Sequence, residues 1–426
     1  MRDDSGPARF AWLPPGLRPP VAMAWRQEKI FLLVGVAALF AGYDMNVYGL
    51  ATPQIQAGLH IPENQIAPTL SIFRTAAIVA LLISASADLV GRRRLLLFTI
   101  FGQAVFTLLT AFSGDYLQFV GAQLLTRIFG YSEEMLCFVV IAEEMAAKAR
   151  GWANGTLGAL DYLGAGFASL AFLAVNILPF GWRGLYVVGA VPLFLVAFLR
   201  RNLPETRRFA AQEEIDKARS KTSEGLILLR ELVHQHPWRL LVMMIAAAGF
   251  GFATAPAAFL SSDYLQSVIH YTPLQVNLVF IPGGLVGLAL AIRAGRLSDR
   301  LGRKITTAAV AGCGGLSFAL FYSGITGWYL GPLWSLAFFG FLCGDALIAG
   351  FAIEIVPTRY RATVSGLRYL VSIAAGALSL LLEGRLYDRF HAHAPSVQLL
   401  LCTIPLTMLA VLFLPEPAGK SLEEIA

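Results

Sequence analysis

The chain has 426 residues, of which 57% are hydrophobic and only 14% are charged, and its formal net charge at pH 7 is +6. A soluble domain carries about 25% charged residues, so this composition excludes an ordinary soluble protein and indicates that most of the surface lies in lipid. The basic residues gather between apolar stretches, which favours a role in membrane topology over nucleic-acid binding.

Stretches of about 20 apolar residues, the length that crosses a bilayer as a helix, recur along the chain. We predict twelve such spans, and therefore an all-α membrane protein. The first six lie at 30–51, 68–87, 95–113, 117–141, 152–176 and 184–200, and the second six at 239–262, 274–294, 305–324, 330–353, 363–383 and 397–414. The remaining segments are an N-terminal segment 1–29, a polar connection 201–238 and a tail 415–426, which leaves six-helix bundles at 30–200 and 239–414.

Lys and Arg residues lie mainly on one side of these predicted spans. They occur at Arg92 to Arg94, in the connection 201–238 and at Arg296 to Lys304, whereas the loops on the opposite side hold few. Because Lys and Arg are retained on the cytoplasmic side, we predict that both termini and the connection are cytoplasmic. The expected location is the plasma membrane, which is the inner membrane in a bacterium.

Several landmarks recur at one offset, which is 211 residues (299 − 88 for the first pair). The pairs are Asp88 and Asp299, Glu143 and Glu354, Arg150 and Arg361, and Leu203 and Leu414. A repeat of half the chain length indicates two pseudo-symmetric copies of one unit.

The segment 295–304, Gly-Arg-Leu-Ser-Asp-Arg-Leu-Gly-Arg-Lys, reads as a short basic loop between two spans. It resembles the signature loop of the major facilitator superfamily, which lies between the second and third helix of each half, and a weaker copy begins at Ser84. The resemblance implies two rocking six-helix bundles around a central site, with charged contacts that latch one conformation. The implied gating residues are Asp88, Gly91, Arg92, Arg93, Glu143 and Arg150 in the first half, and Gly295, Asp299, Arg300, Gly302, Arg303, Glu354 and Arg361 in the second.

Ionisable residues within membrane spans are costly, so each is a candidate functional residue. The predicted spans contain Asp44, Arg74, Arg127, Glu133, Glu134, Asp161, Asp345 and Arg368.

Asp44 is the first candidate for proton coupling. A rise of about 1.5 Å per residue places Asp44, Arg74 and Arg127 at depths from which they could meet. A carboxylate next to an arginine can take up a proton and release the arginine, so we predict coupling through Asp44 and Arg127, together with Glu134. The segment 42–49, Gly-Tyr-Asp-Met-Asn-Val-Tyr-Gly, resembles the first helix of proton-coupled porters of aromatic and other organic acids, in which an acid at this place faces an arginine of helix four. A static ion pair that orders the bundle is the alternative.

Charged and aromatic side chains that could face a central cavity are the predicted substrate contacts. They are Tyr43, Tyr48, Arg74, Tyr131, Asp161, Phe252, Asp345 and Arg368. The aromatic residues could instead pack within the bundles, and Asp161 could order two helices through a buried hydrogen bond. Asp345 and Arg368 could form a purely structural ion pair.

These features predict a secondary active transporter that moves a small organic acid, such as an aromatic carboxylate, by alternating access coupled to protons. A sugar or polyol porter is one alternative, because 204–208 and 415–425 resemble the ends of the halves in sugar and metabolite porters. The helix at 246–256, however, lacks the paired glutamines and the asparagine of sugar porters. The same architecture would also serve a proton-driven drug or metabolite exporter, or a sensor built on a transporter fold.

Other classes of function find little support in the sequence. The four cysteines lie within apolar stretches without a Cys-x-x-Cys pair, and the six histidines, His391 and His393 among them, lie in loops or near span ends. We see no nucleophile with a base and no set of metal ligands, so we predict no enzyme, no metal and no cofactor. The expected partners are a small-molecule substrate, protons and the lipid bilayer, with a monomer as the working unit because one chain contains both halves.

Overall fold

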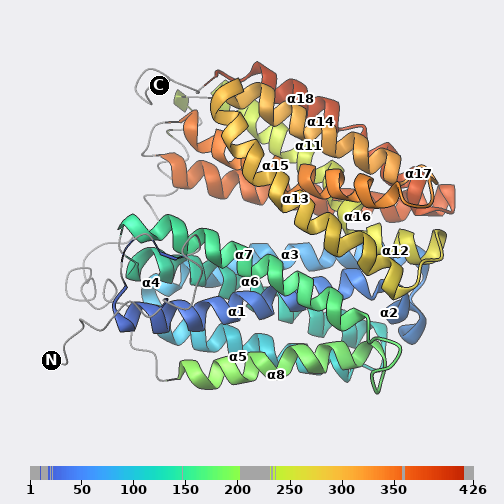
Figure 1. Ribbon diagram of the computed structural model, residues 1–426, viewed down its shortest axis with the longest axis horizontal. Helices are drawn as coiled ribbons and strands as arrows, with labels where there is room; N and C mark the ends of the chain where they lie inside the picture. Colours follow the sequence, from blue (N-terminus) through green and yellow to red (C-terminus); the bar gives the residue numbers. More distant parts are fainter. Residues whose placement is uncertain are drawn as a thin grey trace. The chain divides into compact units, whose positions relative to one another are not determined.

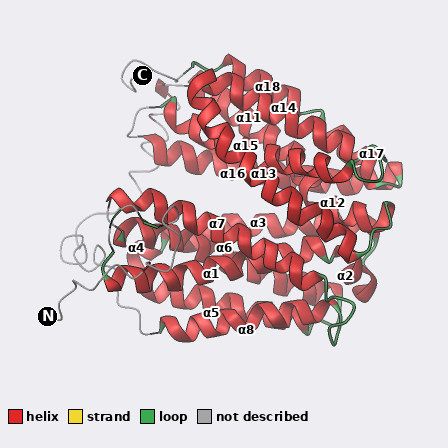
Figure 2. Ribbon diagram, viewed as in Figure 1, coloured by secondary structure: helices red, strands yellow, loops and turns green. Residues whose placement is uncertain are grey.

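The computed structural model describes residues 23–145, 147–201, 237–356 and 360–416, with single positions between 10 and 21 and between 231 and 235. Most of the predicted segment 1–29, the connection 201–238 and the tail 415–426 therefore lies outside the described residues. Within the described ranges every regular element is helical, as predicted (Figures 1 and 2).

The helices of the first half of the chain are α1 (Trp25–Leu50), α2 (Thr52–Leu59), η3 (Glu63–Gln65), α3 (Ile66–Ala85), α4 (Ala87–Val90), α5 (Arg92–Ala111), α6 (Tyr116–Glu144), α7 (Ala147–Phe172) and α8 (Trp182–Arg200). Those of the second half are α11 (Pro237–Phe259), α12 (Ser261–Asp263), η4 (Tyr264–Val268), α13 (Pro273–Leu301), α14 (Arg303–Phe321), α15 (Leu330–Glu354), α16 (Arg361–Phe390), α17 (His393–Leu401) and α18 (Ile404–Phe413).

Ten membrane-spanning candidates, by length and hydropathy, occur among the described residues. The predicted spans 117–141 and 152–176 correspond to α6 and α7, which are long enough at 29 and 26 residues but are not among these ten candidates. The predicted span 397–414 is divided into α17 and α18, because Pro405 at the start of α18 favours a new helix N-terminus there.

Contacts between helices divide the chain into two compact units. Unit 1 is Met1–Ile55 with Ala76–Arg219, and unit 2 is Gln56–Thr75 with Ser220–Ala426. The sequence assigns Gln56–Thr75 to the first bundle instead, and the predicted bundle boundaries stay a prediction.

Helix pairing inside the two units follows one plan. In unit 1, α1 packs on α7 and α5 packs on α6. In unit 2, α11 packs on α16 and α14 packs on α15, which are the same pairs one repeat later. Gly164 allows the approach of α1 and α7, since a Cβ at this position would collide with the backbone carbonyl of Leu39.

The signature segment is less of a loop than the sequence suggests. Helix α13 continues to Leu301, so residues 295–301 are helical and the chain turns only at Gly302. This corrects the prediction of a loop over 295–304, and the physical reason is that residues 296–301 contain no Gly or Pro to end the helix. Gly91 and Gly302 have φ of 99° and 97°, a conformation that favours glycine, and each ends one helix and begins the next.

Candidate functional site

Asp44 lies on α1 inside unit 1, and only 1% of it is exposed. Its Oδ2 accepts hydrogen bonds from Thr107 Oγ1 at 3.0 Å and from Gln103 Nε2 at 3.4 Å, both on α5. Its Oδ1 has no hydrogen bond to any described residue. Because the two donors are a hydroxyl and an amide, they can remain partners of this carboxyl group with or without its proton.

Arg127 on α6 provides a positive charge that acts on Asp44. The arginine is buried, its Nη2 donates to the carbonyl of Met45 at 3.3 Å, and its Nη1 lies 3.4 Å from Met45 Sδ. The guanidinium is therefore held beside the residue that follows Asp44. The two residues that the sequence paired lie in one buried region of unit 1, and their coupling role stays a prediction.

Two further acids lie in the same unit. Glu134 on α6 is half-buried, and the negative charge of Asp161 on α7 acts on it. Asp161 lies against α1, since a Cβ added at Gly42 would be 2.8 Å from Asp161 Oδ1. Asp44, Glu134 and Asp161 thus come from three helices of unit 1, which gives this unit several groups that could take up a proton.

The aromatic residues of unit 1 that were predicted to contact substrate mostly pack against other residues of the same unit. Tyr43 is buried and its hydroxyl donates to the carbonyl of Leu185 at 2.8 Å. Tyr48 is also buried, with its ring 5.8 Å from the ring of Phe119. Tyr131 on α6 is half-buried. The contacts of Tyr43 and Tyr48 are those of packing residues, and a substrate role for the three tyrosines stays a prediction.

Arg74 on α3 belongs to unit 2. Its guanidinium carbon lies 5.6 Å from the centre of the Phe259 ring on α11, a distance at which a cation is attracted to an aromatic face. Gly376 on α16 makes room for it, because a Cβ there would lie 2.7 Å from Arg74 Nη2. Phe252, the other predicted contact on α11, is half-buried.

Asp345 on α15 and Arg368 on α16 form the ion pair that the sequence suggested. The Nη1–Oδ1 distance is 2.7 Å, and Nη2 lies 3.5 Å from Oδ2. The arginine side chain is 5% exposed and that of Asp345 45%, so the carboxylate remains accessible while the guanidinium is enclosed. Whether this pair contacts substrate stays a prediction.

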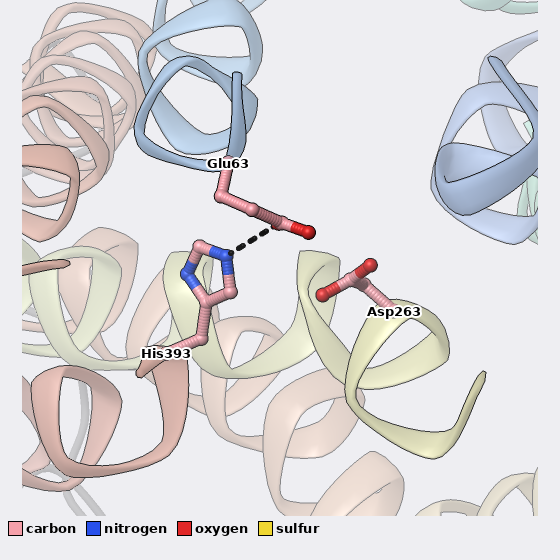
Figure 3. Close-up of side chains that lie close together, drawn as sticks. All are labelled: Glu63, Asp263 and His393. Carbon is pink, nitrogen blue, oxygen red and sulfur yellow. Dashed lines mark ion pairs between the residues drawn. The ribbon is translucent and has the colours of Figure 1, made fainter. Parts of the chain in front are cut away.

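A group of ionisable residues that the sequence did not single out lies at one end of unit 2. Glu63, Asp263 and His393 come from η3, α12 and α17 and point toward one another (Figure 3). Sequence spacing could not find it, because the three residues are 130 or more positions apart.

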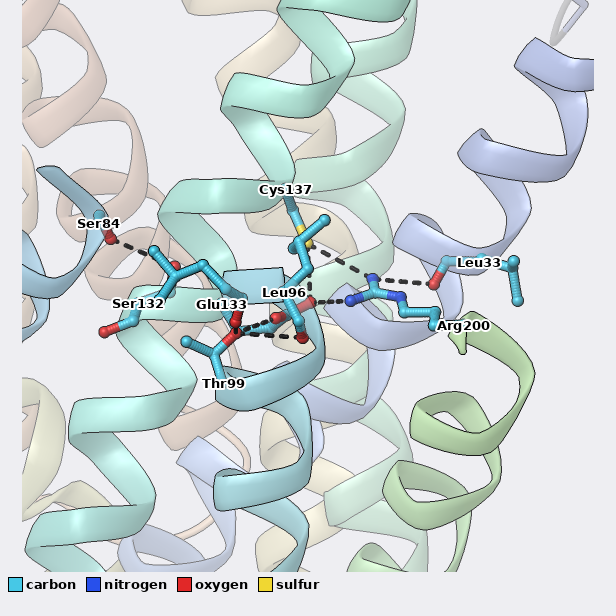
Figure 4. Close-up of polar contacts among 9 residues, drawn as sticks. Leu33, Ser84, Leu96, Thr99, Ser132, Glu133, Cys137 and Arg200 are labelled. Carbon is cyan, nitrogen blue, oxygen red and sulfur yellow. Dashed lines mark hydrogen bonds and ion pairs between the residues drawn. The ribbon is translucent and has the colours of Figure 1, made fainter. Parts of the chain in front are cut away.

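A second missed feature is the partner of Glu133 (Figure 4). Arg200 at the end of α8 is completely buried and pairs with Glu133 of α6. Thr99 donates to Glu133 Oε2 at 2.6 Å, and Arg200 Nη2 donates to the carbonyl of Leu33 at 3.1 Å. The only signal in the sequence was that a buried Glu133 needs a partner, which does not say which arginine supplies it.

Among the gating residues that the structure describes, an ion pair occurs in each unit. In unit 1, Arg92 Nη2 lies 2.9 Å from Glu143 Oε1. In unit 2, Arg303 contacts both oxygens of Glu354, with Nε and Nη2 each at 2.9 Å. The two pairs are 211 residues apart, as the repeat requires.

Several other predicted gating residues are only partly described. The side chains of Asp88, Arg150 and Asp299, and the surroundings of Gly295, lie outside the described residues. Arg93 donates from Nη2 to the carbonyl of Arg201 at 2.7 Å. Arg300 is exposed in the last turn of α13, and Arg361 begins α16. A gating function for the whole set stays a prediction.

Comparisons with known proteins agree with this architecture. A cis,cis-muconate transport protein of Acinetobacter baylyi is 25% identical over 363 residues, 82% of this chain and 85% of the relative. A probable 4-methylmuconolactone transporter of Cupriavidus pinatubonensis is 24% identical over 434 residues, 98% of this chain and 95% of the relative. Among solved structures, the D-xylose–proton symporter superposes with a TM-score of 0.72 at 17% identity, over 92% of this chain and 99% of that chain, a likeness of fold alone.

The family pattern of the Major Facilitator Superfamily matches residues 34–379. This match confirms the predicted fold of two six-helix halves and the prediction that the chain is a transporter of a small molecule rather than an enzyme. On the paired signature segments, the repeated ion pairs and this match, the chain belongs to the Major Facilitator Superfamily of integral membrane transporters.

Proposed function

We propose that the protein couples the movement of a small organic acid to protons, with Asp44 as the group that takes up the proton. The observation that carries this proposal is the buried carboxyl group of Asp44, which has neutral donors on α5 and the charge of Arg127 nearby. Protonation would remove the negative charge from this region and change the balance of forces on Arg127. A buried group whose charge changes is a means of biasing two conformations of a transporter.

The proposed substrate is an organic anion, and an aromatic carboxylate fits best. Two relatives bear the names of a muconate and a methylmuconolactone transporter. In unit 2, the guanidinium of Arg74 lies next to the ring of Phe259, so a charge for a carboxylate and a surface for an apolar ring occur together. We further infer that the chain works as a monomer in the bacterial inner membrane, with both termini cytoplasmic.

The central experiment measures proton-driven accumulation by the protein reconstituted in liposomes. Asp44→Asn keeps the size and most hydrogen bonds of the side chain but cannot release a proton, so accumulation driven by a pH gradient should fall to background. Exchange of substrate across the membrane without a gradient should persist. The matched control is Asp115→Asn, the same chemical change on the exposed cap of α6, where Asn caps as well as Asp.

Accumulation by Asp44→Asn at the wild-type level would contradict the coupling role.

The substrate is identified first by thermal stabilisation of the purified protein with muconate, benzoate, xylose and a cationic drug. Stabilisation by the carboxylates that is lost in Arg127→Ala or Arg74→Ala supports the organic-acid proposal. Stabilisation by xylose alone would favour a sugar porter, the class of the D-xylose–proton symporter whose fold the chain shares, and stabilisation by the drug alone would favour an exporter.

A further inference from the structure

Glu63, Asp263 and His393 bring one potential ligand atom each into a small volume within unit 2. These atoms all lie within 4.8 Å of one another. Asp263 is 1% exposed and His393 5%, whereas the side chain of Glu63 is 40% exposed. Two members of the group, Asp263 and His393, are therefore buried, and the third, Glu63, is partly exposed.

Glu383 and Tyr387 fix the orientation of the His393 ring. Its Nδ1 lies 2.7 Å from Oε1 of Glu383, a completely buried carboxylate on α16. The ring of Tyr387 packs on the imidazole with centroids 4.4 Å apart. When Nδ1 donates to Glu383, the lone pair of Nε2 faces Glu63 and Asp263 (Figure 3). A carboxylate behind the histidine is the arrangement that orients histidines which bind metals.

The Nε2 atom of His393 is buried and has no hydrogen bond within the described part of the chain. It lies 3.5 Å from Oε2 of Glu63. Bonds of 2.0–2.2 Å to a tetrahedral zinc ion place two ligand atoms about 3.4 Å apart, so this distance already suits a shared metal. The other two pairs of ligand atoms both involve Asp263 and lie within 4.8 Å, so a shared zinc ion requires Asp263 to approach the other two ligands by at most about 1.4 Å.

The charges of the group also favour a divalent cation. Glu63, Asp263 and Glu383 are three acids around a single imidazole, and buried carboxylates are costly without compensating positive charge. A proton on His393 adds one positive charge, whereas a divalent cation adds two and also binds the free lone pair of Nε2. One imidazole nitrogen and two carboxylate oxygens form a ligand set that zinc accepts, with a fourth position left for water.

We propose that Glu63, Asp263 and His393 bind a divalent transition-metal cation, with Zn²⁺ as the best fit, and that Glu383 is the positioning residue for His393. The three ligands belong to η3, α12 and α17, so a bound ion would tie together three segments that are far apart in the sequence. The site is separate from the Asp44 region of unit 1, and its test needs no knowledge of the transported substrate.

The experiment uses the full-length protein, purified in detergent and stripped of metal with a chelator. Titration with Co²⁺ should give the visible absorption of a cobalt ion with nitrogen and oxygen ligands, saturating at one ion per chain, and Zn²⁺ should remove this signal. His393→Gln and Asp263→Asn should abolish the signal, and Glu63→Gln should weaken it. Glu383→Gln should weaken metal binding by about 10- to 100-fold, the usual effect of losing such a second partner.

The controls match the variants in residue type. His391→Asn replaces an exposed histidine two residues away, and Asp388→Asn replaces an acid that bonds to Asn64 instead of the group. Both should bind Co²⁺ like wild type. Glu63→Gln is the variant least expected to misfold, because the side chain of Glu63 is partly exposed. Gel filtration of every variant checks the fold. Binding to wild type no stronger than to His393→Gln would overturn the proposal and leave a protonated histidine among carboxylates.

Discussion

The signature segment of unit 1 and its repeat in unit 2 build the same ion pair in surroundings that differ in exposure. In unit 1 the side chains of Arg92 and Glu143 are 6% and 9% exposed. In unit 2 those of Arg303 and Glu354 are 24% and 29% exposed. Breaking a buried pair leaves a charge stranded away from water, whereas a half-exposed pair can be replaced by water. The same ion pair therefore occurs in both repeats, but breaking it should cost more free energy in unit 1 than in unit 2.

The second hydrogen-bond partner of the arginine also differs between the repeats. Arg92 Nη1 donates to the backbone carbonyl of Ala87 at 3.0 Å, and Arg303 Nη1 donates to the hydroxyl of Ser298 at 3.0 Å. Ala87 and Ser298 occupy the same position of the repeat. A backbone acceptor replaces a side-chain acceptor, so the weaker sequence match of the first copy does not imply a weaker contact.

Removing the arginine of each pair should separate the two units most clearly. Arg92→Met removes the positive charge that faces the nearly buried carboxylate of Glu143 and should lower the free energy of unfolding by about 3–5 kcal/mol. Arg303→Met should cost only about 1 kcal/mol, since Glu354 can be hydrated. Unfolding by SDS in mixed micelles measures both, and Arg94→Met, at an exposed neighbouring position, is the control, expected within about 0.5 kcal/mol of wild type. Equal losses for Arg92→Met and Arg303→Met would contradict the difference in burial.

A second point of comparison concerns the start of α14. The carboxylate of Glu416 accepts from the backbone N–H groups of Arg303 at 2.7 Å and Lys304 at 3.1 Å, which satisfies two donors at a helix N-terminus. Glu416→Ala should cost about 1–2 kcal/mol of unfolding free energy, and Glu416→Gln, which keeps an acceptor, about half of that. The corresponding Glu205 lies outside the described residues.

The same SDS titration applied to Glu205→Ala asks whether unit 1 has this cap as well. A loss equal to that of Glu416→Ala would extend the symmetry of the repeat to the helix ends. No loss in Glu416→Ala itself would show that water replaces the carboxylate at no cost, against the expectation for two backbone donors.

Periodic and local features of this fold were predictable from the sequence. Span length follows from apolar runs, and the 211-residue offset identified Glu143 and Glu354 as equivalent before any contact was known. The sequence also allowed the pairing of Asp345 with Arg368 as one of two interpretations, because both residues lie in the cytoplasmic third of neighbouring predicted spans. Helix ends were less certain, as α13 shows by continuing to Leu301.

Contacts that depend on tertiary packing were not predictable. Arg200 stands at the last position of α8, where a basic residue ordinarily marks the cytoplasmic edge, yet it is buried against Glu133. His393 meets Glu63 only because α17 and η3 lie together in unit 2, although the two residues are 330 positions apart. One sequence fixes neither the rotation of each helix about its axis nor its neighbours, and these decide which charges meet.

The smallest expected effect concerns the residue that differs between the two arginine sites. Ser298→Ala removes one hydrogen bond from Arg303 while leaving its contacts with Glu354, so it should cost about 0.5–1.5 kcal/mol of unfolding free energy. The reciprocal change Ala87→Ser should be nearly neutral, because Arg92 already uses the backbone carbonyl there. Since both changes alter a single oxygen at equivalent positions, they compare the two repeats directly. A gain in stability from Ala87→Ser as large as the loss from Ser298→Ala would mean that the carbonyl is a poor substitute for the hydroxyl, and that the first copy is the weaker contact after all.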